Sequence, residues 1–129
     1  MSRSYKPDGY TSVAPYLVVD GASRLIDFLV QVFGAERLRM VPGEAGRLRH
    51  GEVRIDDTVV MIADALPGWP ALESHLHVYV ADVDATFGRA LAAGAESVQA
   101  PMKKDDPDRR GGFKGPGGVT WWVATQTEP

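Results

Sequence analysis

Apolar residues between positions 20 and 36 recur every three or four residues, which is the spacing of a helix with one buried face. The set consists of Leu25, Phe28, Leu29, Val32 and Phe33. Asp20 precedes this set as a candidate N-cap, and Gly34 follows it as a candidate left-handed stop. Before Asp20, the apolar run 13–19 predicts a strand. This region is therefore expected to form a strand followed by an amphipathic helix.

The same pattern occurs a second time later in the chain. The first helix leads into the tripeptide 34–36, Gly-Ala-Glu, and the same tripeptide returns at 94–96. In the second copy, the apolar run 75–80 leads to Asp82, and a helix is expected over 83–93. Because both ends of the pattern match, the sequence predicts two similar modules in tandem.

Further short apolar runs add three strands to each copy. They cover 36–41, 48–55 and 58–63 in the first copy, and 97–100, 112–114 and 119–125 in the second. We therefore expect an α+β protein with two βαβββ modules, 1–66 and 75–129, in one structural unit. Residues 1–11 are expected to be a loosely held arm, and 67–74, with two prolines and a glycine, a linker.

Two segments near the C-terminus have unusual compositions. The segment 103–112 is highly charged, which predicts an exposed loop, and whether this loop covers a site as a lid stays open. The glycines at 111–112 and 115–118 are attributed to turns that require positive φ.

Composition narrows the classes of partner. The 129 residues carry a net charge of −3 without a basic stripe, which argues against nucleic acid as a partner. There is no cysteine, so disulfides and thiolate metal sites are excluded. No window approaches 18 uninterrupted apolar residues, which argues against membrane insertion. A cytoplasmic location is expected.

Three segments carry a family resemblance: 15–20 (PYLVVD), 75–82 (HLHVYVAD) and 115–122 (GPGGVTWW). Together with the paired modules, they resemble the vicinal oxygen chelate superfamily, in particular its glyoxalase/bleomycin resistance protein/dioxygenase group and the PhnB-like branch. The resemblance implies that curved mixed sheets enclose a cavity. It also implies a homodimer in which chains exchange modules, so that each cavity draws residues from both.

The resemblance further implies four positions for the ligands of a divalent metal ion. In this sequence they fall on Val13, Met61, His75 and Trp122, of which His75 alone is a family ligand. No cofactor is therefore expected. The alternative is a divalent metal ion held by a rearranged set, formed by His50, Glu52, His75 and His77.

Strand alternation indicates which side chains line the cavity. His75, His77 and Tyr79 share one face of their strand, opposite an aliphatic face that must pack on the helix. Trp121 is expected in the core, and Trp69 is either a lid or a hydrophobic plug. The full set of predicted ligand-binding residues is Val13, Pro15, Leu17, His50, Met61, Trp69, His75, His77, Tyr79 and Trp122.

Such a wall is apolar and aromatic, and the chain has no nucleophile or dinucleotide motif. Such a wall predicts a site that holds a planar or hydrophobic molecule without catalysis. The resemblance to bleomycin-resistance-type proteins implies a metal-independent binding protein that sequesters a small hydrophobic or aromatic molecule, such as an antibiotic. The alternative is a divalent-metal-dependent lyase, isomerase or dioxygenase of the glyoxalase type that uses His75 and non-standard ligands.

Overall fold

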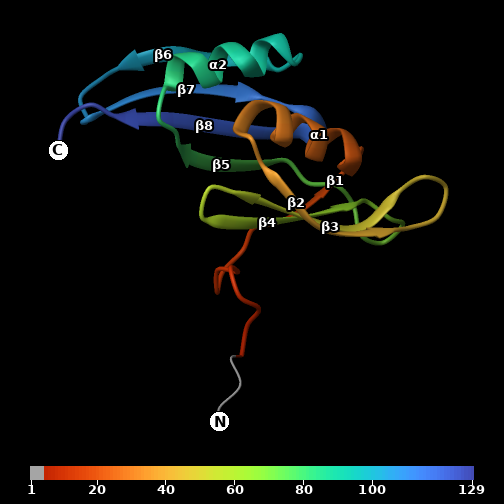
Figure 1. Cartoon of the computed structure of the whole chain (residues 1–129). Coiled ribbons are helices and arrows are strands. Elements are labelled where there is room, and N and C mark those ends of the chain that lie inside the picture. The colour runs from red at the N-terminus through yellow and green to blue at the C-terminus, as the bar shows by residue number, and fades with distance from the viewer. Residues whose placement is uncertain (1–4) are drawn as a thin grey trace.

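Each half of the chain forms one four-stranded sheet and one helix in the computed structural model, which describes residues 5–129 (Figure 1). The first module contains β1 (Tyr16–Val19), α1 (Ala22–Phe33), β2 (Glu36–Pro42), β3 (Leu48–Ile55) and β4 (Thr58–Asp64). The second contains β5 (Ser74–Tyr79), α2 (Val83–Ala92), β6 (Glu96–Lys103), β7 (Asp108–Lys114), the 3₁₀ turn η1 (Pro116–Gly118) and β8 (Val119–Gln126).

Both sheets have the same topology. Their strand orders are β1-β4-β3-β2 and β5-β8-β7-β6. In each, the first and last strands of the module pair in parallel, and the other neighbours are antiparallel. The predicted fold class, an α+β protein with two tandem βαβββ modules and mixed sheets, is confirmed.

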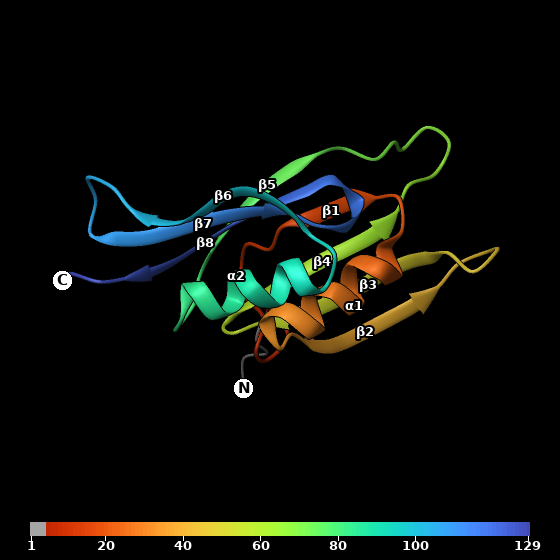
Figure 2. The ribbon, with the colours of Figure 1, turned by 90° about the horizontal axis from the view of Figure 1, so that it is seen from above.

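One apolar core joins the two modules. It combines the buried faces of α1 and α2 with one face of each sheet. The Phe33 ring of α1 lies 5.5 Å from Trp121 of β8, which confirms that Trp121 belongs to the core. Figure 2 shows the two helices side by side. The sheet faces that contact the helices are called inward below, and the opposite faces outward.

The N-terminus of α1 differs from the sequence prediction. Its N-cap is Gly21 in a left-handed conformation, without a side-chain cap from Asp20. Asp64, at the end of β4, instead accepts hydrogen bonds from the Gly21 and Ala22 amides at 3.0 and 2.9 Å, and from Leu48 at 2.7 Å. A distant carboxylate therefore satisfies the helix end. At the second helix, Asp82 caps through the Ala85 amide at 3.1 Å.

The charged segment near residue 105 is mostly a hairpin rather than a loop. β6 extends to Lys103 and β7 starts at Asp108, so 104–107 alone connect them. Gly111 and Gly112 lie inside β7 and lack positive φ, which corrects their attribution to turns. Gly117 and Gly118 do have positive φ, as the turn explanation requires.

The N-terminal arm leaves the first sheet on the side opposite α1 (Figure 1). The described part of the arm is attached at two points, where Arg54 donates to the Gly9 carbonyl at 3.2 Å and Tyr10 donates to Glu52. Residues 1–4 of the predicted arm lie outside the described part of the chain.

Candidate functional site

The outward faces of the sheets carry the chemically active side chains. On β5, Leu76 and Val78 pack against the core, whereas His75, His77 and Tyr79 are exposed on the other face. This is the alternation that the sequence predicts. On the first sheet, the same alternation turns His50, Glu52 and Met61 outward, because Val53, Val60 and Ile62 belong to the core.

A buried carboxylate organises the outward face of the first sheet. Glu52 is 5% exposed. It accepts hydrogen bonds from the Tyr10 hydroxyl at 2.5 Å and from His50 Nε2 at 2.7 Å. Burial alone would raise the pKa of Glu52, but these two hydrogen bonds and nearby positive charge, including that of Arg39, together outweigh it, and its pKa lies below the usual range. The side chain is therefore held as an anion between two donors.

Aromatic rings continue this face beyond His50. The Tyr16 ring lies 5.6 Å from the His50 ring, and its hydroxyl is 3.3 Å from His50 Nδ1. On its other side, Tyr16 lies 5.7 Å from Trp69, which remains 46% exposed. Trp69 is held there by reciprocal backbone hydrogen bonds with Leu66. The linker tryptophan thus extends the outward face of the first sheet.

On the second sheet, Trp122 and His75 form a hydrogen-bonded pair. The indole Nε1 of Trp122 donates to His75 Nδ1 at 3.1 Å. Trp122 pairs in register with Gly112, and an ideal Cβ at Gly112 would come within 2.6 Å of the indole ring. The indole therefore occupies space that a side chain at position 112 would fill.

A polar network lies next to this pair. The Tyr79 hydroxyl donates to Asp108 at 2.6 Å, and Arg110 donates to Asp108 at 2.9 Å and to His77 Nε2 at 3.1 Å. The hydrogen bond to Asp108 raises the pKa of Tyr79. Partial burial and then the Arg110 guanidinium lower the pKa of His77, which favours its neutral form.

Two predicted wall residues lie elsewhere. Val13 is 84% exposed and precedes β1. Leu17 is buried in the core, whereas Pro15 lines a hollow between the modules together with His77 and Tyr79. The assignment of Leu17 to the cavity wall was wrong, because β1 begins at Tyr16 and turns its odd-numbered positions toward the helices and the core.

The residue that β1 turns outward is Tyr16, which sequence reasoning missed together with Tyr10, Gly112, Asp108 and Arg110. For Tyr16, the sequence signal was its alternation with Leu17 and Val19, which are both apolar and belong to the core. For the others, the register between strands is needed, and the sequence does not give it.

The implied metal positions do not fit a divalent ion. Val13 and Trp122 offer no atom that binds such a cation, and a thioether like that of Met61 suits soft metals. The rearranged set divides into His50 with Glu52 on one sheet and His75 with His77 on the other. Within residues 5–129, no three histidine, aspartate or glutamate side chains converge to hold an ion.

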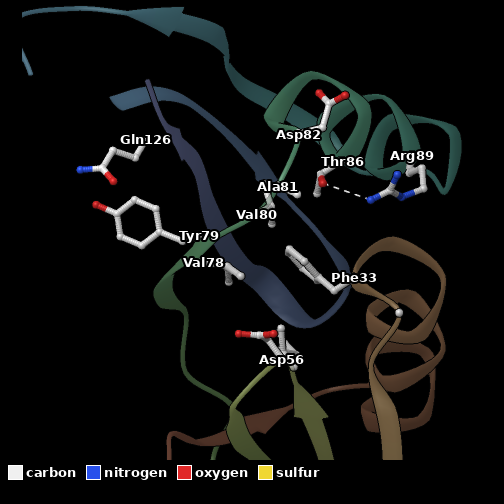
Figure 3. Close-up of a pocket in the computed structure, with 12 residues that line it drawn as sticks. Phe33, Asp56, Val78, Tyr79, Val80, Ala81, Asp82, Thr86, Arg89 and Gln126 are labelled. Carbon is white, nitrogen blue, oxygen red and sulfur yellow. Dashed lines mark hydrogen bonds between the residues drawn. The ribbon is translucent and has the colours of Figure 1, made fainter. Parts of the chain in front are cut away.

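A hollow of about 1050 Å³ lies between the modules and includes Tyr79 in its lining (Figure 3). Among its charged side chains, Asp56 lies in the turn between β3 and β4, and Arg89 and Asp82 already serve the helices. Arg89 donates to the Val32 carbonyl and, as Figure 3 shows, to Thr86, each at 3.1 Å, and Asp82 caps α2. We therefore place the candidate site on the outward faces.

The comparison with protein families agrees with this architecture. Residues 10–123 match the Glyoxalase/Bleomycin resistance protein/Dioxygenase superfamily. The chain belongs to this superfamily. It is also 39% identical over 124 residues to the uncharacterized protein Mb0911c of Mycobacterium bovis, with 85% of this chain and 80% of that protein covered.

Solved structures share the fold. TioX from Micromonospora sp. ML1 is 26% identical with a TM-score of 0.71, covering 89% of this chain and 99% of that one. TnmS3, an antibiotic binding protein from Streptomyces sp. CB03234, is 22% identical with a TM-score of 0.66, covering 91% and 99%. A PhnB protein from Bacillus cereus is 15% identical with a TM-score of 0.73, covering 89% and 99%. The latter two similarities concern the fold.

Proposed function

We propose that this protein is a homodimeric binding protein that sequesters a small hydrophobic or aromatic molecule, such as an antibiotic, in cavities closed by two chains. The observation that carries the proposal is the exposure of aromatic side chains on both outward faces, with Tyr79 62% exposed and Tyr16 and Trp69 also open to solvent. Exposed aromatic surface of this extent is typical of a binding site or an interface.

The direction of the two faces supports a role for the second chain. Within one chain, the inward faces share the core with the helices, so the outward faces point away from it. A cavity between the outward faces of a first and a second sheet then requires sheets from two chains. Related folds support the kind of ligand, since TnmS3 is an antibiotic binding protein.

We further propose that binding needs no metal ion. The support is the chemistry of Val13, Met61 and Trp122 at three of the four implied ligand positions. The histidines of the rearranged set are also engaged, because His50 Nε2 donates to Glu52, His75 Nδ1 accepts from Trp122 and His77 Nε2 accepts from Arg110.

A cytoplasmic location stays a prediction. Neither helix of residues 5–129 is long and apolar enough to cross a membrane.

The test combines metal analysis with a ligand panel on the unmodified protein. Protein dialysed against chelator is incubated with aromatic antibiotics and with matched non-aromatic ones, and the retained compound is quantified by mass spectrometry after gel filtration. We expect unchanged compound to be retained at up to one molecule per chain, with no dependence on added zinc, nickel, manganese or iron(II).

Two results would contradict the proposal. Conversion of a retained compound to a product would show catalysis, and stoichiometric metal that His75→Ala removes would show a metal centre. Leu91→Ala is the control for nonspecific adsorption of the compound. It changes an exposed apolar residue on α2, away from the outward faces, and should leave retention unchanged.

A further inference from the structure

The ring planes of Trp122 and His75 are nearly parallel. The planes of the two rings differ by 10°, and their centroids are 6.4 Å apart. The indole N–H lies in the plane of the indole, and the Nδ1 lone pair lies in the plane of the imidazole. Because these two groups are joined at 3.1 Å, the rings lie edge to edge rather than one above the other. The pair is thus one continuous flat surface.

The hydrogen bond also indicates the tautomer of His75 in this arrangement. An indole nitrogen is always a donor, so Nδ1 of His75 accepts, as in the tautomer that carries its proton on Nε2. The two rings can keep this arrangement without any ligand, which reduces the ordering cost of binding.

Gly112 supports the flat surface from below. An ideal Cβ at this position would lie 2.6 Å from two carbons of the benzo ring of Trp122 and 3.3 Å from a third. Such similar distances to three ring carbons mean that a face of the ring, rather than its edge, rests against the glycine. In the first module, the matching place beside Met61 is filled by Glu52. At this pair of positions, an aromatic ring can therefore lie flat against the backbone of the second sheet but not of the first.

We propose that Trp122 and His75, resting on Gly112, form a platform that binds fused-ring planar aromatic molecules by face-to-face stacking. This inference rests on the proposed function, because it names the chemical class that the same site takes. A flat surface of one indole and one imidazole matches a ligand of two or more fused rings. A puckered, saturated molecule of equal size touches the platform with only part of its atoms.

The experiment uses two probes that differ in planarity and share a hydroxyl group, 2-naphthol and decahydro-2-naphthol. Each is titrated into ¹⁵N-labelled full-length protein, and the indole N–H resonance of Trp122, assigned with Trp122→Phe, is followed by NMR. We expect 2-naphthol to shift this resonance saturably, and decahydro-2-naphthol to leave it in place at the same concentrations.

The decisive variant is Gly112→Ala, which keeps both rings but lifts the indole. We expect it to weaken 2-naphthol binding by about tenfold or more, the usual worth of one stacking contact. Gly88→Ala is the matched control, because a Cβ at this position on α2 meets no atom within 4 Å. Where Gly112→Ala fails to fold, His75→Leu removes the acceptor instead, and should move the Trp122 resonance and weaken 2-naphthol binding.

Equal binding of the two probes, or undiminished 2-naphthol binding by a folded Gly112→Ala or His75→Leu protein, would overturn the platform. Neither result depends on the antibiotic panel. Retention of a non-planar antibiotic by the unmodified protein, with no response to 2-naphthol, would overturn the platform while the sequestering function stands.

Discussion

At the scale of single residues, the buried carboxylate of Glu52 binds the N-terminal arm to the outward face of the first sheet through its hydrogen bond from Tyr10. Glu52→Gln keeps its size but replaces two charge-assisted hydrogen bonds, from Tyr10 and His50, with weaker ones. We expect the free energy of unfolding at pH 7 to fall by about 1.5–3 kcal/mol. Urea unfolding followed by circular dichroism measures this change.

The effect should depend on pH in a defined direction. The pKa of Glu52 is lowered in the folded protein, so its contribution to stability is complete above the pKa of the unfolded chain and is lost as the pH falls through the folded pKa. The difference between the two proteins should therefore shrink below about pH 4. Glu73→Gln is the control, because the exposed Glu73 pairs with Lys114 at the surface. A larger loss from Glu73→Gln would contradict the assignment.

Asp108 should control the ionisation of Tyr79. The phenol donates to this carboxylate, and losing its proton would remove the hydrogen bond and place two negative charges side by side. We expect Asp108→Asn to lower the pKa of Tyr79 toward the ordinary value of a tyrosine. Titration of ¹³Cζ-labelled tyrosine by NMR follows this pKa.

Asp84→Asn is the matched variant for this titration. It removes the carboxylate of α2 that pairs at 2.8 Å with Arg109, the neighbour of Asp108 on β7. Asp108, the hydrogen-bond partner of Tyr79, stays in place. The pKa of Tyr79 should stay raised in this variant. An equal fall in both variants would mean that the overall charge around β7, rather than the hydrogen bond, sets the pKa of Tyr79.

At the scale of elements, the N-terminus of α1 is capped by a carboxylate distant in sequence rather than by the aspartate next to it. Asp64 accepts three backbone hydrogen bonds, two of them from the first residues of the helix, whereas Asp20 makes no side-chain cap. We expect Asp64→Ala to lower the free energy of unfolding by about 2 kcal/mol or more, and Asp20→Ala to change it by under about 0.5 kcal/mol. Chemical denaturation of both variants under one condition tests this, and equal losses would contradict it.

The helices were predictable because their amphipathic pattern and glycine ends are local. The same holds for the alternation of His75, His77 and Tyr79, since a strand against a core must alternate. The cap from Asp64 was not predictable, because it joins positions 43 residues apart at Gly21. The length of β7 also escaped prediction, since its charged residues are paired with partners on other elements, as Arg109 is with Asp84.

The site itself was predicted in part. The alternation pattern found the outward residues of β5. The alternation pattern failed on β1, because Pro15 left the start of the strand undefined. As a result, Leu17 rather than Tyr16 was assigned to the cavity wall. Gly112 could not be recognised, because its role depends on lying opposite Trp122 on the neighbouring strand. The register between strands is not visible in one sequence.

At the scale of the whole molecule, the direction of the two outward faces leads to the last prediction. If each cavity combines the first sheet of one chain with the second sheet of another, a variant in either sheet damages every cavity of its own homodimer. Tyr16→Ala and Trp122→Ala should each abolish retention of a compound that the unmodified protein keeps. Unfolding and refolding the two variants together makes mixed dimers, each with one cavity free of substitutions.

With random pairing, roughly a quarter of all cavities should then recover. Retention after gel filtration measures the recovery, and sedimentation confirms that dimers have formed. Refolding Trp122→Ala with His75→Ala is the control, because both changes lie on the second sheet and no mixed dimer regains an intact cavity. No recovery from the Tyr16 and Trp122 pair would mean that each cavity is built within one chain, whereas recovery in the control as well would mean that refolding alone restores binding.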